Sequence, residues 1–538
     1  MAELSQPTQN LIAKYELWRR SQKPKDDVKT IHVDEVASKV AVFYEHIRTI
    51  VDWKEEHLMR RAAIIRKIKR IFLDLESNNS PIQSLTESLV TELVRGGFFS
   101  NDHIEESKVS DIQRIIEKYV FILNNNPKNR KSKSWLEFYN WLLEVASCEI
   151  EETLAPSMKE MSLIDYMFES MKERIRVSEK IYQKNILTKK DADIQIYIAV
   201  QQALFKLDKP IISYNLIKYK YPWWGRSSQE ELLQFSQNIH NIWMSIERDL
   251  SHPIAKKFYN ICEKYDTAYL LIGDILSQDN MAKILEEVSE PSSLESYVRS
   301  AYLKRLKDLN AKVQRAAVYS TLSIFITKIL SLVVLEVILA KLFNGHFDIF
   351  ILGVDVLIPT LLMVLLVSTL KKPSKKNISL VIMEIIKTFY QREKIDVYEV
   401  RSSKKRGVIT KFMLYLIYLA GAFISFSAIW WVLNYFGFPL SSIIINIIFI
   451  ALILFAGTNI QKRSQELTIE ETSGGFLVFV SDILFLPVTG MGRWMSNTWK
   501  QYNIIIALFN ALIDMPFSVF IEFLEGWRGF IKEKKEEL

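Results

Sequence analysis

Apolar and polar positions divide the chain into a long polar region followed by a strongly apolar one. Between Ala317 and Thr458, apolar stretches occupy residues 318–342, 349–370, 412–435 and 440–457. A helix of about 20 residues crosses a hydrocarbon core about 30 Å thick, so these stretches, of which the fourth is the shortest, are long enough to span a membrane. The pattern therefore predicts a transmembrane domain of four helices over residues 318–458.

Short turns join these stretches into two predicted helical hairpins. The first turn, residues 343–348, contains the helix-stopping pair Asn344 and Gly345, and the second turn spans only residues 436–439. Neither turn contains Lys or Arg, whereas the connection between the hairpins, residues 371–411, holds twelve of them against four acidic residues. Because basic residues in short flanking segments stay on the cytoplasmic side, we expect a multi-pass protein of the cell inner membrane with both termini in the cytoplasm.

The basic connection and a tryptophan-rich segment near the C-terminus also suggest contact with lipid headgroups. Each Lys or Arg near an anionic surface contributes about 1 kcal/mol, and Trp favours the headgroup level. The expected headgroup contacts are Lys371, Lys372, Lys375, Lys376, Lys404, Lys405, Arg406, Arg493, Trp494 and Trp499. An alternative, which the sequence favours, is that the basic loop serves only to fix the topology.

Three ionisable residues fall inside the predicted bilayer. Lys328 and Glu336 lie in the first stretch, and Asp355 lies in the second. Counted from the turn, Glu336 and Asp355 have similar depths, and Lys328 is about 12 Å from Glu336 along the helix. Such residues cost at least about 2.5 kcal/mol each to insert and usually face the bundle interior. They are the candidate site, either as an ion or proton path or, as we favour, as a structural salt bridge.

Composition gives little sign of chemistry elsewhere. The chain has 538 residues with a net charge of +7, and its mean hydropathy is +0.06. The positive charge is concentrated beside the membrane, so nucleic acid is not expected as a partner. The two cysteines, Cys148 and Cys262, are expected in the cytoplasm, where disulfides are rare. We expect neither a metal site nor a cofactor.

The polar region reads as an all-α cytosolic domain over residues 31–291, preceded by a flexible tail, residues 1–30, with Pro7 and Pro24. Apolar residues at helical intervals predict a series of helices. These cover residues 34–76, 82–94, 104–124, 134–152, 162–184, 189–207, 228–248, 254–276 and 281–287. Ser227 and Glu230 have the spacing of a capping box. The one convincing strand pattern is residues 394–400, in the basic connection.

The segments on either side of the transmembrane domain are also predicted to be helical. No Gly or Pro occurs between Pro291 and Asn344, so a helical connector, residues 292–317, can continue into the first span as one helix. A break near Asn310 is the alternative. Residues 459–538 are predicted to form an interfacial amphipathic region, with a short apolar segment that ends at Pro487. The polar residues of 503–525 share about a third of the helix circumference. A fifth crossing there is the alternative, and it conflicts with the charge rule.

Five segments resemble a family of uncharacterised bacterial polytopic membrane proteins that have a long α-helical cytosolic N-terminal region. They are EEHLMRRAAI (55–64), DIQIYIAVQQALFKLD (193–208), FLPVTGMGRW (485–494), DMPFSVFIEFLEGW (514–527) and the final KEKKEEL. The resemblance implies this architecture and adds no functional residue.

The motifs of common enzyme classes are missing from the sequence. It contains neither HExxH, nor G-x-S-x-G, nor a phosphate-binding G-x-x-x-x-G-K-[ST]. We therefore expect a non-enzymatic membrane scaffold or adaptor, whose partners are membrane lipids and a protein bound by the N-terminal helical domain. The alternative is a channel or transporter component that uses Lys328, Glu336 and Asp355, and a lipid-modifying membrane enzyme ranks third. The oligomeric state stays open.

Overall fold

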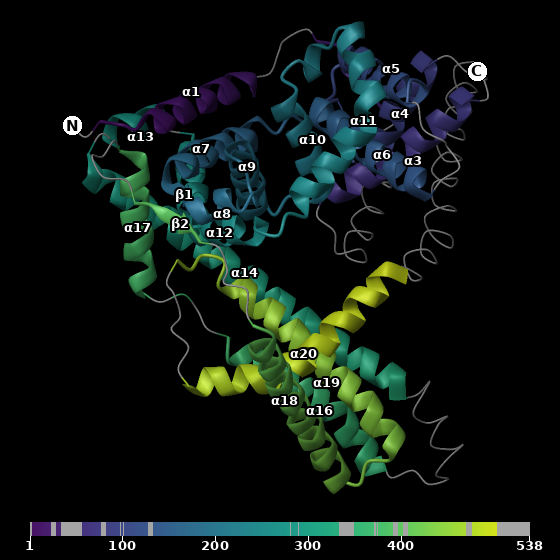
Figure 1. Ribbon diagram of the computed structural model, residues 1–538, viewed down its shortest axis with the longest axis vertical. Coiled ribbons are helices and arrows are strands. Elements are labelled where there is room, and N and C mark those ends of the chain that lie inside the picture. The colour runs from purple at the N-terminus through teal and green to yellow at the C-terminus, as the bar shows by residue number, and fades with distance from the viewer. Residues whose placement is uncertain are drawn as a thin grey trace, which may run out of the picture. The chain divides into compact units, whose positions relative to one another are not determined.

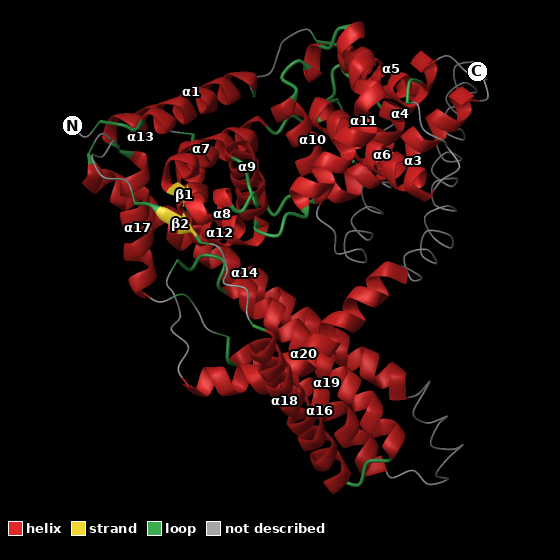
Figure 2. Ribbon diagram, viewed as in Figure 1, coloured by secondary structure: helices red, strands yellow, loops and turns green. Residues whose placement is uncertain are grey.

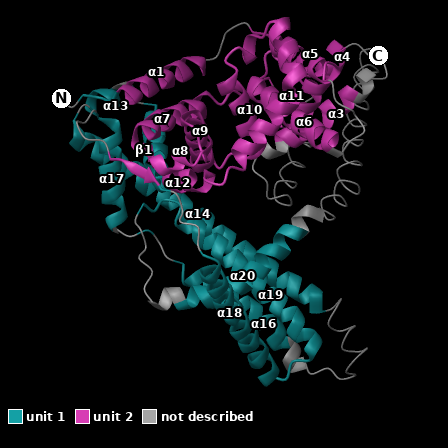
Figure 3. Cartoon of the chain, viewed as in Figure 1, with its two compact units in different colours: residues 1–5, 264–394, 401–503 teal, residues 6–263, 395–400, 504–538 magenta. Residues whose placement is uncertain are grey.

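The computed structural model describes a chain that is almost entirely helical, which confirms the all-α prediction (Figure 2). The described residues are 3–22, 28–33, 56–76, 82–96, 98–99, 102–126, 133–279, 281–288, 290–332, 349–370, 373, 375–390, 396–401, 407–469 and 476–502. The chain divides into two compact units (Figure 3). Unit 1 comprises residues 1–5, 264–394 and 401–503, and unit 2 comprises residues 6–263, 395–400 and 504–538.

Unit 2 is a helical domain built around α6. Its helices are α1 (Gln6–Ser21), α3 (Glu56–Glu76), α4 (Ile82–Arg95), α5 (Ser107–Asn124), α6 (Lys133–Leu154), α7 (Met158–Arg174), α8 (Glu179–Gln183), α9 (Lys189–Phe205), α10 (Lys209–Lys220), the 3₁₀ turn η1 (Trp224–Arg226), α11 (Gln229–Leu250) and the first part of α12 (Ala255–Leu276). α6 packs against α3, α5 and α10. Its second half is buried on every side, from Trp141 to Glu151 with one half-buried position, which is typical of a helix at the centre of a domain.

Several predicted elements of unit 2 need correction. The expected flexible tail is wrong for residues 6–21, which form α1 and bury Leu11 and Tyr15 where α1 packs against α7. Pro7 falls in the first turn of this helix, a position that tolerates proline. The predicted helix over 162–184 is interrupted by β1 (Ile175–Val177), and α10 was not expected at all. Of the predicted long helix over 34–76, residues 34–55 lie outside the described part.

The predicted strand in the basic connection is present, although it is shorter than expected. β2 (Tyr398–Val400) pairs in parallel with β1, with Ile175 opposite Tyr398 and Val177 opposite Val400. Both strands belong to unit 2, whereas the helices that precede and follow β2 in the sequence belong to unit 1. The chain therefore leaves unit 1 after α17 (Lys375–Phe389), contributes a strand to unit 2 and returns to unit 1 at α18 (Val408–Tyr435).

Unit 1 contains the apolar helices. They and their neighbours are the end of α12, α13 (Met281–Glu287), α14 (Pro291–Ser331), α16 (Ile349–Ser368), α17 (Lys375–Phe389), α18 (Val408–Tyr435), α19 (Leu440–Ser464) and α20 (Phe476–Tyr502). α14, α16, α18, α19 and α20 gather in one bundle (Figure 1). α14 begins at Pro291 and continues without a break to Ser331, as predicted, because no Gly or Pro interrupts it.

Two helices of the described chain, α18 and α19, are long and apolar enough to cross a membrane. α16 contains a shorter apolar segment, Gly353–Ser368, and the end of the first predicted span lies outside the described residues. The four-helix count thus stays a prediction. α19 has 25 residues, so the stretch expected to be shortest is part of a longer helix.

Two further segments of unit 1 differ from the sequence prediction. Residues 375–389 of the basic connection form α17, whose apolar face buries Val381 and Ile385, so this part is a packed helix rather than a loop. α20 runs through Pro487, where a helix end was expected. α20 packs against α18 and α19. The expected amphipathic helix over 503–525 lies outside the described residues.

Candidate functional site

The predicted intramembrane charges form a buried ion pair in unit 1. Lys328 lies near the end of α14, and its Nζ is 2.6 Å from Oδ2 of Asp355 on α16. The two side chains are 0% and 1% exposed. By counting residues from the turn, Lys328 is expected about 12 Å from the depth that Glu336 and Asp355 share. The structure corrects this, since the two side chains are in direct contact. Glu336 lies outside the described residues.

A third helix completes this cluster with Asn446, which sequence reasoning missed. The fully buried Asn446 side chain of α19 donates hydrogen bonds from Nδ2 to Oδ1 of Asp355 and to the carbonyl oxygen of Ser442. The Lys328 ammonium also lies 5.2 Å from the centre of the Phe449 ring, within reach of a cation–π interaction. In the sequence, Asn446 is a single amide within a long apolar run, and this isolated polar residue was the sign that could have identified it as a member of the cluster.

The geometry of this cluster favours a structural role for its two charges. Opposite charges neutralise each other, and α14, α16 and α19 each supply one polar partner. Removing one partner of a buried pair leaves an uncompensated charge and typically costs about 3–5 kcal/mol. The cluster can therefore fix the relative register of three helices.

The predicted headgroup residues are only partly within the described chain. Lys376 is exposed in the first turn of α17, and Arg493 and Trp494 are exposed on α20. Lys375 belongs to α17, and Trp499 belongs to α20. Lys371, Lys372, Lys404, Lys405 and Arg406 lie outside the described residues. Headgroup contact is compatible with these exposed positions and stays a prediction.

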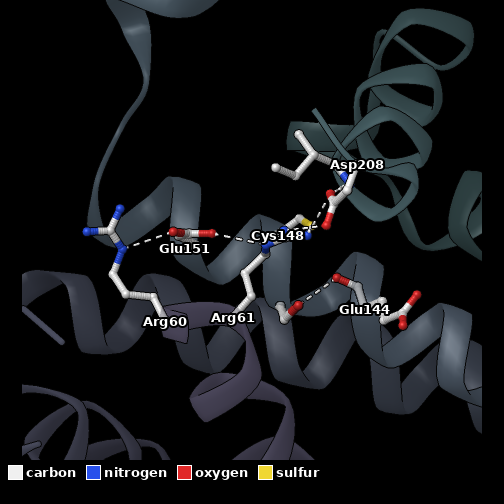
Figure 4. Close-up of polar contacts among 8 residues, drawn as sticks. Arg60, Arg61, Glu144, Cys148, Glu151 and Asp208 are labelled. Atoms are coloured by element: carbon white, nitrogen blue, oxygen red, sulfur yellow. Dashed lines mark hydrogen bonds and ion pairs between the residues drawn. The ribbon is translucent and has the colours of Figure 1, made fainter. Parts of the chain in front are cut away.

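Unit 2 contains a second buried polar cluster, around Arg61 of α3 (Figure 4). Arg61 Nη1 and Nη2 donate to the two carboxylate oxygens of Asp208 at 3.0 and 2.6 Å. Asp208 also caps α10, because its Oδ1 accepts a hydrogen bond from the Ile211 amide. Glu151 of α6 lies between Arg61 and Arg60, with its oxygens 3.6 and 3.0 Å from their Nε atoms. The cluster thus joins α3, α6 and α10.

Cys148 lies against this cluster and is buried. Its Sγ accepts a hydrogen bond from Arg61 at 3.5 Å. Burial raises the pKa of Cys148 to about 12, although the neighbouring Arg61 lowers it. Because the thiolate is the nucleophile, we expect a buried thiol with a raised pKa to react slowly at neutral pH. For Arg61, burial opposes the charged form, yet Cys148 and Asp208 hold its pKa above the usual value.

A cavity of about 480 Å³ borders this cluster. Polar groups on its wall include Arg60, Glu151, Glu152 and Tyr214, and its apolar groups include Phe205. Glu152 accepts hydrogen bonds from Tyr214 at 2.6 Å and Lys218 at 2.7 Å. Two of the carboxylates on its wall, those of Glu151 and Glu152, are therefore engaged in ion pairs or hydrogen bonds.

Three aromatic side chains of unit 2, those of Phe138, Trp141 and Trp224, lie in its core. Trp141 and Trp224 are buried, and the Trp224 Nε1 donates to Glu149 at 3.0 Å. Within the described residues, no group of three or more His, Cys, Asp or Glu side chains is arranged to hold a metal ion.

Comparison with known proteins adds no relative. No protein-family model matches the chain. No curated protein matches it, and no solved structure matches its fold. The resemblance to a bacterial membrane-protein family therefore stays a prediction, and the functional argument rests on the geometry of the two units.

Proposed function

We propose that this protein is an integral membrane scaffold or adaptor that couples a cytosolic helical domain to the bilayer. In this proposal, α14, α16, α18 and α19 of unit 1 supply four transmembrane helices. Unit 2 is the cytosolic domain that presents its pocket and surface to a protein partner. Both termini lie in the cytoplasm, and the membrane is the inner membrane of the cell.

The observation that carries the membrane part of this proposal is the surface of α18. Only 6% of the residues in its most apolar 18-residue stretch are buried. Its exposed residues include Phe412, Tyr415, Phe423 and Trp431, each at least 60% exposed. Apolar surface of this extent is unfavourable in water by about 25 cal/mol per Å². Monomeric soluble proteins rarely expose contiguous apolar patches of this kind. A hydrocarbon environment removes that cost.

The paired charges favour a scaffold over an ion pathway. Lys328 and Asp355 are buried against each other, and Asn446 occupies the second carboxylate oxygen of Asp355. A pathway needs a carboxylate that is accessible to exchange a proton or ion, whereas both groups here are fully buried. The strand β2 supports coupling, because the connection between α17 and α18 contributes it to unit 2.

Flux and extraction measurements test this proposal together. Purified full-length protein is reconstituted into liposomes, and proton, sodium and potassium flux are compared with those of protein-free liposomes. The double variant Lys328→Met, Asp355→Leu serves as the matched comparison. The proposal predicts that the protein resists alkaline carbonate extraction and adds no flux. Flux that the double variant abolishes would instead support a channel or transporter.

A further inference from the structure

The helix α20 lies across the apolar helices of unit 1 and packs against them with its middle (Figure 1). Val488 of α20 is 1% exposed and belongs to the same core cluster as Ala451 and Leu454 of α19. The carbonyl oxygen of Leu484 accepts a hydrogen bond from Ser425 of α18 at 2.7 Å. One side of α20 is therefore fixed to the bundle, and the opposite side faces outward.

These contacts place the middle of α20 beside the interior of the predicted spans. Ser425 lies 14 residues after Lys411, and Ala451 lies 11 residues before Lys462. At 1.5 Å per residue, the two contact points are about 16–21 Å from the basic residues that flank the spans. A hydrocarbon core is about 30 Å thick. In the proposed membrane arrangement, the middle of α20 therefore lies at the depth of the lipid chains.

The outward side of α20 has an apolar centre between two opposite charges. Phe485 and Leu486 are 54% and 56% exposed, and Asp482 and Arg493 are exposed on either side of them. With Thr489, these residues fall within about 100° of the helix circumference. Among the described residues, neither charge has an ion-pair or hydrogen-bond partner. Ionisable residues at membrane depth are rare and usually pair with one another, so this face calls for counter-charges.

The order of its residues makes this outward face complementary to itself. The midpoint between Asp482 and Arg493 falls between Pro487 and Val488. When two copies of α20 pack antiparallel about a two-fold axis at that midpoint, Asp482 of each copy lies opposite Arg493 of the other. The apolar residues between the charges then meet at the centre. A two-fold interface uses the same surface on both subunits, which is the property that this face has.

We propose that the protein forms a homodimer in the membrane through antiparallel contact between the outward faces of its α20 helices. This inference rests on the proposed membrane function, because charges attract each other more strongly in hydrocarbon than in water. A second copy supplies both counter-charges at the required spacing of 11 residues, which lipid chains do not. Each ion pair then removes two unpartnered charges from the lipid.

Exchange of the two charges tests the dimer. Full-length protein is reconstituted into liposomes over a range of protein densities, and its oligomeric state is counted by single-molecule photobleaching. Asp482→Arg alone and Arg493→Asp alone each place like charges opposite each other. Each should raise the dimer dissociation constant by at least about tenfold. A wild-type protein that stays monomeric, or single variants that dimerise as well as the wild type, would overturn the inference.

Restoring the opposite charges should restore the dimer. The double variant Asp482→Arg, Arg493→Asp has the two charges exchanged, and an equal mixture of the two single variants again places unlike charges opposite each other. Both should dimerise like the wild type, and failure of both would contradict the antiparallel pairing. The matched control is Lys376→Asp, a charge reversal at an exposed position of α17, which should leave the dimer intact.

Cross-linking with a short bifunctional maleimide separates an antiparallel contact from a parallel one. Two copies of Leu486→Cys lie about 5 Å apart along the helices in the proposed dimer and should join. Two copies of Asp482→Cys lie about 16 Å apart and should not, whereas Asp482→Cys should join Arg493→Cys when the two proteins are mixed. Efficient joining of Asp482→Cys to itself would show a parallel contact and overturn the inference.

The outcomes also keep the dimer apart from the proposed membrane function. Extraction of the protein by alkaline carbonate would defeat the membrane function, whatever the oligomeric state. A protein that resists extraction but stays monomeric would defeat only the dimer.

Discussion

Breaking the buried ion pair from one side should destabilise the protein far more than removing both partners. Lys328 and Asp355 are 0% and 1% exposed, so a single substitution leaves a charge without solvent or counter-charge. The expected cost is about 3–5 kcal/mol for Lys328→Met or Asp355→Leu. Asp355→Leu should cost more, because Asn446 also loses the acceptor for its Nδ2.

The double variant Lys328→Met, Asp355→Leu should recover most of that loss. Replacing a buried pair by apolar residues of similar volume is often neutral, so we expect a coupling energy of at least about 2 kcal/mol. Reversible unfolding in mixed micelles, followed by helical circular dichroism, gives the four free energies of the cycle. Lys307→Met, an exposed position on the same helix, is the control and should change stability by less than about 0.5 kcal/mol. Additive single effects would refute the structural role of the pair.

Three other predictions follow from packing and ionisation. Gly492→Ala should cost about 1–3 kcal/mol in the same unfolding assay, because a Cβ there would meet a backbone carbonyl of α19, whereas Gly353→Ala, with open space around it, should be neutral or slightly stabilising. Cys148, with its pKa raised to about 12, should react with a thiol reagent at pH 8 only after unfolding, and fast labelling of the native protein would contradict its burial. Burial and Glu149 raise the pKa of Tyr119, and burial and nearby carboxylates raise that of Tyr214. Unfolded tyrosine ionises near pH 10, so the stability from these groups is full below pH 10 and falls above it, and tyrosinate absorbance should rise together with loss of helix.

Local patterns account for the parts of the fold that were predicted correctly. The run from Pro291 that lacks Gly and Pro is one helix, and a capping box was expected where one exists, although one residue early: Ser228 and Glu231 form it. The missed helix α10 starts at Lys209 after the cap residue Asp208, with Pro210 in its first turn. In a sequence, a proline is compatible with the start of a helix and with the end of one, and the local sequence around Pro210 does not decide between the two.

Contacts between distant segments explain what the sequence did not predict about the sites. The pairing of Lys328 with Asp355 was foreseeable, because two opposite charges in neighbouring apolar helices need each other. Arg61 and Asp208 lie 147 residues apart, and nothing in either local sequence indicates that they meet. Asn446 was overlooked for a different reason, since a single neutral amide does not disturb the apolar pattern that identified its helix.

Labelling of single cysteines in cells tests the membrane account most directly. The native Cys148 and Cys262 are 4% and 0% exposed, so they give little background. Phe436→Cys, in the turn between α18 and α19, should react with a membrane-impermeant maleimide from outside the inner membrane. Lys376→Cys and Lys462→Cys should react only after the membrane is permeabilised. Labelling of Phe436→Cys and Lys462→Cys from the same side would contradict the crossing of α19 and, with it, the proposed four-helix topology.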